Sequence, residues 1–192
     1  MQVKMSRNRE KSVIGSIMSW ILYILVVVVL SLLCVTFVAQ RTKVIGQSMY
    51  PSLNDADQLI VDKISYRFSE PERFDVVVFP YRYEQNKRYI KRIIGLPGET
   101  VQIIDGEVYI DGEKLKDPFG EQIGLMDDAG MAAEPLTLSD DEYFVLGDNR
   151  NNSKDSRFSD VGPIHKDELI GKAWLQIYPF SEFGFVSHGE EQ

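Results

Sequence analysis

The first 40 residues contain one long run that is uncharged and apolar. No charged residue lies between Lys11 and Arg41, and residues 20–30 would be apolar on every side of a helix. A surface helix of a soluble protein would instead show a polar stripe with a period of 3.6 residues. The 29 residues from 12 to 40 would form a helix about 43 Å long, which exceeds the roughly 30 Å hydrocarbon core of a bilayer. The pattern predicts a transmembrane anchor over residues 12–40, preceded by a short basic tail, residues 1–11.

A cleaved secretory signal is the alternative interpretation of this run, because basic residues lead directly into it. Signal peptides usually have an apolar core of about 7–15 residues and small side chains before the cleavage site. The run here is longer, and the bulky Phe37 stands where a small residue would be required before Ala39. The pattern therefore favours an anchor that is retained.

Beyond Arg41 the pattern changes to short β-branched and alternating segments, which are typical of strands. Between residues 100 and 115, two Asp-Gly pairs separate alternating segments, and Asp-Gly tolerates the positive φ of a type I′ turn, so a β-meander is expected. Residues 116–138 are expected to form a long irregular excursion. Further strands are expected at residues 59–64, 73–80, 142–146 and 169–178, with another β-type segment at 88–99. We predict one mostly β body, residues 41–192, with an antiparallel sheet.

Charge separates the two parts of the chain. The sequence has 21 Lys and Arg and 29 Asp and Glu, a net charge of −8; residues 1–40 carry +3, so residues 41–192 carry −11. An acidic body argues against nucleic acid as a partner. Four cations precede the apolar run and two follow it closely, so the positive-inside rule predicts a cytoplasmic N-terminus and an extracytoplasmic body. A single cysteine excludes an intrachain disulfide and a zinc site of several thiolates, and two histidines leave little for a metal site.

Ser48 is a candidate nucleophile, because it lies between a glycine and a proline-containing turn that could expose its hydroxyl. A serine in such a place is usually a turn former. Tyr50 stands where the second glycine of a Gly-x-Ser-x-Gly elbow would be required. His188 lies in an acidic tail that is expected to be solvated, and His165 is expected to be a surface residue, so the base for Ser48 is not expected to be a histidine.

Lysine is the remaining candidate base, because a neutral amine can accept a hydroxyl proton if burial lowers its pKa. Lys91 lies within an apolar β-type segment, where an isolated lysine would be costly to bury. The alternative is an edge-strand lysine that prevents aggregation. A third polar cluster, residues 147–157, would be a solvated loop if it were considered alone.

Taken together, the three segments 46–53, 89–99 and 147–157 resemble, in order and spacing, the sequence boxes of type I signal peptidases. The resemblance covers most of residues 40–179, includes the N-terminal anchor, and is similar to the short, single-span members typical of Gram-positive bacteria. It implies a mostly β, antiparallel catalytic body of the signal-peptidase type, which binds substrate as an added strand with shallow pockets for small residues. It also implies the partners, namely preproteins emerging from the secretion channel and membrane lipid, and it implies no metal or organic cofactor.

For the site, the resemblance implies a serine endopeptidase with a Ser/Lys dyad that removes N-terminal signal peptides from secreted preproteins. Ser48 would attack the scissile carbonyl and its backbone N–H would help bind the oxyanion, while neutral Lys91 would act as general base. Ser153 would hydrogen-bond and orient the Lys91 amine, and Asp155 and Arg157 would form an ion pair that shapes the third box. The departures from the family pattern are Ser52 in place of Thr, Phe74 in place of Gly, and Gly46 in place of a residue with a hydroxyl.

Two rival functions have different requirements. A membrane-tethered β-domain that only binds ligands would leave Ser48 and Lys91 as unpaired surface residues. A self-cleaving Ser/Lys peptidase of the repressor type should carry a helical DNA-binding head, and the apolar anchor argues against it.

Overall fold

The N-terminal part of the chain is one long helix in the computed structural model, which describes residues 2–120, 122 and 124–189. The helix α1 extends over Gln2–Phe37, and residues Gly15–Leu32 are long and apolar enough to cross a membrane. The side chains of this segment are exposed in the isolated chain, so their apolar surface is available to lipid. The helix continues through the predicted tail and ends three residues before the predicted end of the anchor, because β1 (Ala39–Lys43) begins there.

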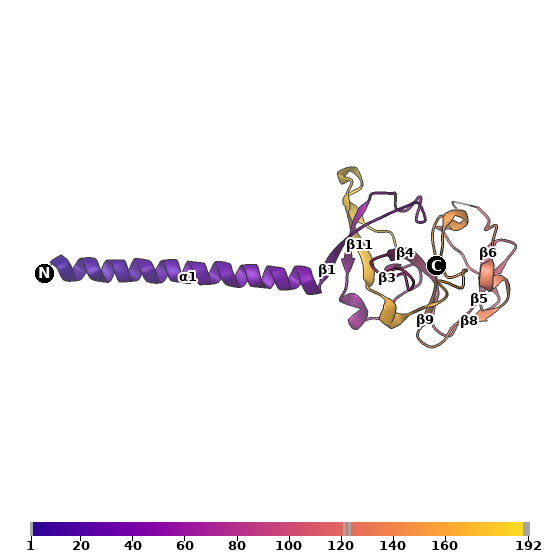
Figure 1. Cartoon of the computed structure of the whole chain (residues 1–192), viewed down its shortest axis with the longest axis horizontal. Coiled ribbons are helices and arrows are strands. Elements are labelled where there is room, and N and C mark those ends of the chain that lie inside the picture. The colour runs from indigo at the N-terminus through magenta and orange to yellow at the C-terminus, as the bar shows by residue number, and fades with distance from the viewer. Residues whose placement is uncertain (1, 121, 123, 190–192) are drawn as a thin grey trace. The chain divides into compact units, whose positions relative to one another are not determined.

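The chain divides into two compact units, Met1–Ala39 and Gln40–Gln192, and the second unit contains two sheets. In the larger sheet the strands follow the order β1-β2-β11-β3-β4-β9-β10, with β12 paired to β11, and the pairings from β2 to β10 are antiparallel. Figure 1 shows β3, β4 and β11 side by side in this sheet. Its other strands are β2 (Gln58–Asp62), β3 (Val76–Pro80), β4 (Arg88–Gly95), β9 (Glu142–Leu146), β10 (Ile164–His165), β11 (Gly171–Tyr178) and β12 (Gly184–Phe185).

The smaller sheet contains the predicted meander. Its strands follow the order β7-β6-β5-β8, that is β7 (Glu113–Lys114), β6 (Glu107–Ile110), β5 (Thr100–Ile104) and β8 (Leu136–Thr137). Asp105 and Gly106 have φ of 51° and 79°, and Asp111 and Gly112 have 51° and 85°. Positive φ at both central residues is what a type I′ turn requires, so the predicted meander is confirmed.

Strand β3, at the centre of the larger sheet, is buried on both faces. Along β3, Val76 and Val78 pack into one apolar cluster, whereas Val77 and Phe79 pack into another on the opposite face. A third cluster lies between the larger sheet and the meander, where Ile94 packs with residues of β5 and β6. The run of apolar residues in β3 therefore reflects its central position, as expected for a strand with no solvated face.

The predicted β class is confirmed, and the differences in strand bounds have local causes. The strand predicted from residue 73 begins at Val76, because Phe74 has a φ of 69° and interrupts the extended backbone. The strand predicted to reach residue 64 ends at Asp62, whose carboxylate accepts hydrogen bonds from the N–H groups of Ile64 and Ser65 and so forms a turn. Outside α1, the helical segments that the structure describes are single 3₁₀ turns: Ser65–Arg67, Gly130–Ala133, Arg150–Asn152, Lys166–Glu168 and Phe180–Glu182.

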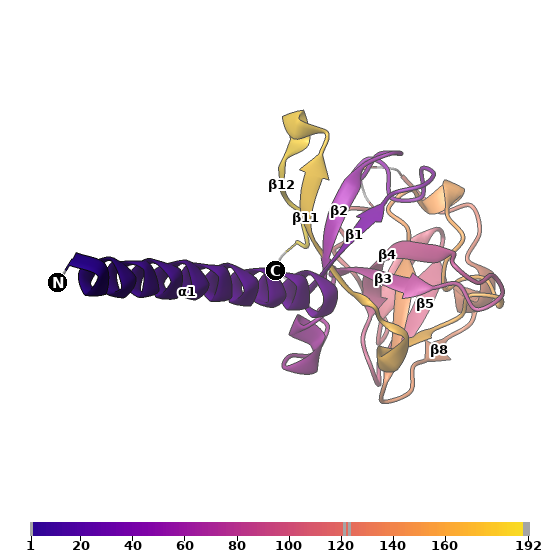
Figure 2. The same ribbon diagram turned by 60° about the vertical axis from the view of Figure 1, so that its left-hand side comes forward.

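β11 and β12 form a hairpin that extends from the rest of the body (Figure 2). Its aromatic side chains are exposed, including Trp174, Phe180 and Phe185. Val186, which follows β12, returns to the core and packs in the same apolar cluster as Met49 and Leu53. The chain thus leaves the body at the hairpin and returns close to the turn that carries Ser48.

Candidate active site

Ser48 lies in the turn that follows β1, and both sides of this turn are held by hydrogen bonds. Gly46 has a φ of 88°, and its N–H donates to the Asp55 carboxylate at 2.7 Å. The backbone N–H of Asn149 donates to the Ser48 carbonyl at 3.1 Å, and the Asn149 side chain donates to the Gln47 carbonyl at 3.0 Å. The third polar cluster therefore holds the backbone of the candidate nucleophile directly.

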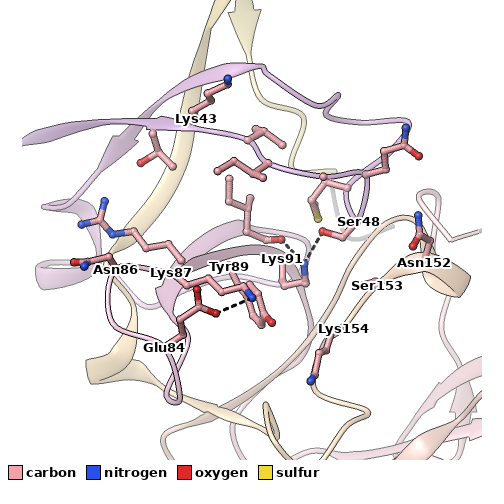
Figure 3. Close-up of a pocket in the computed structure, with 18 of the residues that line it drawn as sticks. Lys43, Ser48, Glu84, Asn86, Lys87, Tyr89, Lys91, Asn152, Ser153 and Lys154 are labelled. Carbon is pink, nitrogen blue, oxygen red and sulfur yellow. Dashed lines mark hydrogen bonds and ion pairs between the residues drawn. The ribbon is translucent and has the colours of Figure 1, made fainter.

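Lys91 lies on β4 with its amine against the Ser48 hydroxyl. The Nζ to Oγ distance is 2.7 Å, and the amine also donates to the Ile90 carbonyl at 3.0 Å (Figure 3). The residue is only 2% exposed, whereas a lysine that protects a strand edge from aggregation would be exposed to solvent. The alternative interpretation of Lys91 as an edge-strand lysine is therefore wrong.

Burial controls the charge of this amine. Desolvation lowers the pKa of Lys91 from 10.5 to about 8, although the negative charges of Asp155 and Asp148 oppose this change. Each carboxylate is paired with a guanidinium: Arg157 lies 2.8 Å from Asp155, and Arg92 lies 2.8 Å from Asp148. These two buried pairs reduce the field that would otherwise keep the amine protonated, so a substantial neutral fraction is available near neutral pH.

Much of the third cluster is buried, although alone it was expected to be a solvated loop; Asn151, Asn152 and Lys154 remain exposed. Asp155 has no exposed surface, and its carboxylate accepts a hydrogen bond from the Gly147 N–H at 3.1 Å. The expected ion pair with Arg157 is present and is bidentate, with distances of 2.8 and 3.0 Å. Arg157 also donates to the carbonyl of Asp128 at 2.9 Å. Hydrogen bonds therefore compensate for the burial of these polar side chains.

Ser153 does not form the predicted hydrogen bond with Lys91. Its Oγ is buried and has no hydrogen-bond partner among the residues that the structure describes. The hydroxyl nevertheless lies near the site, because a Cβ added to Gly147 would be 2.2 Å from Ser153 Oγ and 2.4 Å from the Ser48 carbonyl. Catalytic hydrogen bonds are often incomplete without substrate. The role of Ser153 stays a prediction, with its hydroxyl close to the backbone of Ser48.

Three residues that lie in the segments 89–99 and 147–157, but for which the sequence predicted no individual role, complete the site. Gly147 leaves the space in which Ser153 and the Ser48 carbonyl approach each other. Arg92 and Asp148 form a fully buried pair, and Arg92 also donates to the carbonyls of Phe74 and Ser187 at 2.8 and 2.9 Å. An arginine within an apolar strand segment was a signal for such a pair, because a buried guanidinium requires a partner.

The two histidines have different environments. His188 was expected in a solvated tail, and this prediction is wrong, because its Nδ1 accepts a hydrogen bond from the Val76 N–H at 3.1 Å. Burial lowers the pKa of His188 to about 4, so the ring is neutral at ordinary pH. His165 lies at the surface, 3.1 Å from Asp141, as expected. Neither histidine is among the described residues that hydrogen-bond to Ser48.

A cleft of about 1210 Å³ gives access to the serine and the lysine. It is lined by residues 41–49, 84–91 and 151–154 and by Phe158. Among the described residues, no group of three or more His, Cys, Asp and Glu side chains could hold a metal ion. The groups in direct contact at the centre of the site are the Ser48 hydroxyl and the Lys91 amine of lowered pKa.

Comparison with known proteins gives consistent matches over most of the chain. The family described as "Signal peptidase, peptidase S26" matches residues 17–178. Signal peptidase I of Bacillus amyloliquefaciens is 36% identical over 186 residues, which cover 92% of this chain and 96% of that protein. Signal peptidase I S of Bacillus subtilis (strain 168) is 37% identical over 177 residues, which cover 87% of this chain and 92% of that protein. A crystal structure of a signal peptidase I from Enterococcus faecalis V583 is 34% identical and covers 54% of this chain and 97% of its own, with a TM-score of 0.45.

Proposed function

Because the chain belongs to the signal peptidase family, peptidase S26, we propose that it removes signal peptides from secreted preproteins with Ser48 as nucleophile and Lys91 as general base. The observation that carries this proposal is the 2.7 Å contact between the Lys91 amine and the Ser48 hydroxyl within a buried site. The pKa of about 8 supports it, because a general base is most effective when its pKa is near the working pH.

The proposed reaction is an acyl transfer in two steps. The neutral Lys91 amine accepts the Ser48 proton while Oγ attacks the carbonyl carbon of the scissile bond, and a tetrahedral oxyanion forms. The ammonium then gives this proton to the leaving amine, so that the new N-terminus departs and an ester to Ser48 remains. Lys91 next accepts a proton from water, whose hydroxide attacks the ester. This proton returns to Ser48 as the carboxylic acid leaves, and the acid then loses its own proton to solvent. We assign the backbone N–H of Ser48 to the oxyanion, because backbone amides serve this role in acyl transfer.

The cleft suits an extended peptide. Residues 88–91 of β4 pair with β3 on one side, whereas β9 pairs with β4 only from Arg92 onward, so the other side of 88–91 has no strand partner among the described residues. On the opposite wall, β1 is the outermost strand of the larger sheet. A substrate strand between these walls could form main-chain hydrogen bonds with them. We expect small side chains at the first and third positions before the cut.

For localisation, we propose that residues 12–40 anchor the enzyme in the cell membrane, with residues 1–11 in the cytoplasm and residues 41–192 outside. The exposed apolar segment Gly15–Leu32 and the four cations before it support this orientation. Protease added to intact protoplasts should degrade the body. Protection of the body until the membrane is broken would contradict the orientation.

A cleavage assay with a labelled preprotein tests the function. The full chain in an uncharged detergent should release the signal peptide, and Ser48→Ala and Lys91→Arg should each reduce cleavage to background, because arginine stays protonated at any workable pH. Ser181→Ala and Lys116→Arg, both at exposed positions, are the matched controls and should retain the wild-type rate. Substantial cleavage by Lys91→Arg would exclude the proposed dyad.

A further inference from the structure

The cleft is cationic, although the body that surrounds it is acidic. Residues 41–192 carry a net charge of −11, yet the charged residues that line the cleft include one carboxylate, Glu84, and six cations. These cations are Arg41, Lys43, Lys87, Arg88, Lys91 and Lys154. The net charge of the cleft is thus opposite in sign to that of the surrounding body. A cleft lined by charges of one sign concentrates ligands of the opposite sign, so this local reversal of charge points to a ligand.

Three of the cations have no carboxylate to neutralise them. Lys43 and Arg88 are exposed and form no ion pair among the residues that the structure describes, and Arg41 bonds to the neutral amide of Gln58. Arg41 and Lys43 are two residues apart on β1, so their side chains lie on the same face of the strand. Arg41, Lys43 and Arg88 together form a cationic rim.

Two further lysines are held in place near the dyad, but their charges are compensated. The amines of Lys87 and Lys154 lie 5.3 and 5.8 Å from the ring centre of Tyr81. The Lys91 amine lies 5.2 Å from the ring centre of Tyr89. The two tyrosine rings are neighbours, with 4.9 Å between their centres. Lys87 is paired with Glu84 and Lys154 with Asp160. Lys154 and Lys91 are both seen below Ser48 in Figure 3, whereas Lys43 lies on the opposite wall. The uncompensated charge therefore comes from the cationic rim.

We propose that the cationic rim makes the enzyme prefer preproteins with Asp or Glu in the segment that occupies the cleft, close to the cut; this inference rests on the proposed function. The rim residues flank the two walls between which an extended peptide would lie, so acidic side chains of that peptide would pass near them. Peptide is favoured over lipid as the occupant, because residues 88–91 of one wall have no strand partner on the cleft side in the described part of the chain, and a lipid headgroup could not pair with them as a strand does. An exposed ion pair is weak, so a single acidic residue should improve kcat/KM by about two- to fivefold.

The test compares two labelled preproteins that differ only by Asp or Asn within three residues of the cut. The full chain in uncharged detergent should cleave the Asp form about two to five times more efficiently, and Lys43→Gln/Arg88→Gln should bring the ratio close to one. Addition of about 0.5 M salt should have the same effect, because exposed charges are screened. Arg67→Gln/Lys116→Gln removes two exposed cations outside the cleft and should retain both the ratio and the rates.

Binding separates this inference from the proposed function. The same peptides should show the same preference in fluorescence anisotropy with the Ser48→Ala protein, whether or not the wild type cleaves them. A wild-type ratio of one or below, or a ratio that survives the rim substitutions, would overturn the inference. If those substitutions instead weaken sedimentation with anionic vesicles and leave the peptide ratio unchanged, the charge serves the membrane surface and the inference is also overturned.

Discussion

Replacement of Lys91 by methionine should make the protein inactive and, below about pH 8, more stable. In the folded protein the pKa of Lys91 is lowered from 10.5 to about 8, so the unfolded chain binds more protons than the folded chain between these two values. This lowering of the pKa destabilises the folded wild-type protein by roughly 3 kcal/mol. The destabilisation is present in full below about pH 8 and disappears as the pH rises to 10.5. The lowered pKa also raises the neutral fraction of the Lys91 amine at pH 7 from about 0.03% to about 10%. Only the neutral amine can act as the general base, so the lowered pKa favours catalysis.

The measurement is urea unfolding of the full chain in detergent at pH 7 and at steps up to pH 10.5. Lost hydrogen bonds to Ser48 and Ile90 offset part of the gain in Lys91→Met, so the quantity to compare is the change with pH rather than the absolute stability. The stability of Lys91→Met relative to wild type should fall by roughly 3 kcal/mol between pH 8 and 10.5. The exposed control Lys116→Met should show no such change. A difference between Lys91→Met and wild type that is constant over this range would refute the reasoning.

Three further substitutions test the surroundings of the dyad. Gly147→Ala places a Cβ 2.4 Å from the Ser48 carbonyl and should lower kcat by about 100-fold. The control Gly184→Ala, whose Cβ would have no atom within 4 Å, should keep the wild-type kcat. Equal kcat values for the two variants would contradict the close approach at Gly147. Ser153→Ala should retain its fold and a measurable rate, and an unchanged rate would show that its hydroxyl does not orient the amine. Burial lowers the pKa of His188 from 6.5 to about 4, so between these pH values the ring is protonated in the unfolded chain but neutral in the folded one. The free energy of unfolding of the wild type should therefore fall as the pH drops from about 6.5 to 4. Urea titrations of His188→Gln should show a smaller fall.

The sequence was sufficient for the β class, the apolar helix and the two Asp-Gly turns, because each depends on a local pattern or on backbone preference. The strand predicted at residues 142–146 matches β9 in full, since β-branched and aromatic residues are bounded by polar ones there. Strand ends were less predictable where a side chain ended the strand, as at Asp62, or where a residue adopted positive φ, as at Phe74.

Contacts between distant segments could not be predicted from local pattern. Lys91 and Ser48 are separated by 43 positions. The residues alone made Lys91 a candidate base beside the alternative of an edge-strand lysine, and the resemblance to a family was needed to choose between them. The buried pair of Arg92 and Asp148 and the return of His188 to β3 depend on sheet order, which no local pattern contains. The expected bond between Ser153 and Lys91 is absent, and a motif identifies residue types without specifying their rotamers.

The positive φ of Phe74 has an evolutionary consequence. The resemblance to the family indicates that glycine is common at this position, and glycine adopts a φ of 69° without the cost of about 1–3 kcal/mol that a bulky side chain incurs. The Phe74 ring compensates by packing at 5.9 Å from Phe119 and against Gly189, and its loss would leave a cavity costing about 3–5 kcal/mol. Position 74 should therefore not drift independently: lineages that carry glycine there should have filled the same volume from position 119 or 189, and the three positions should have changed together.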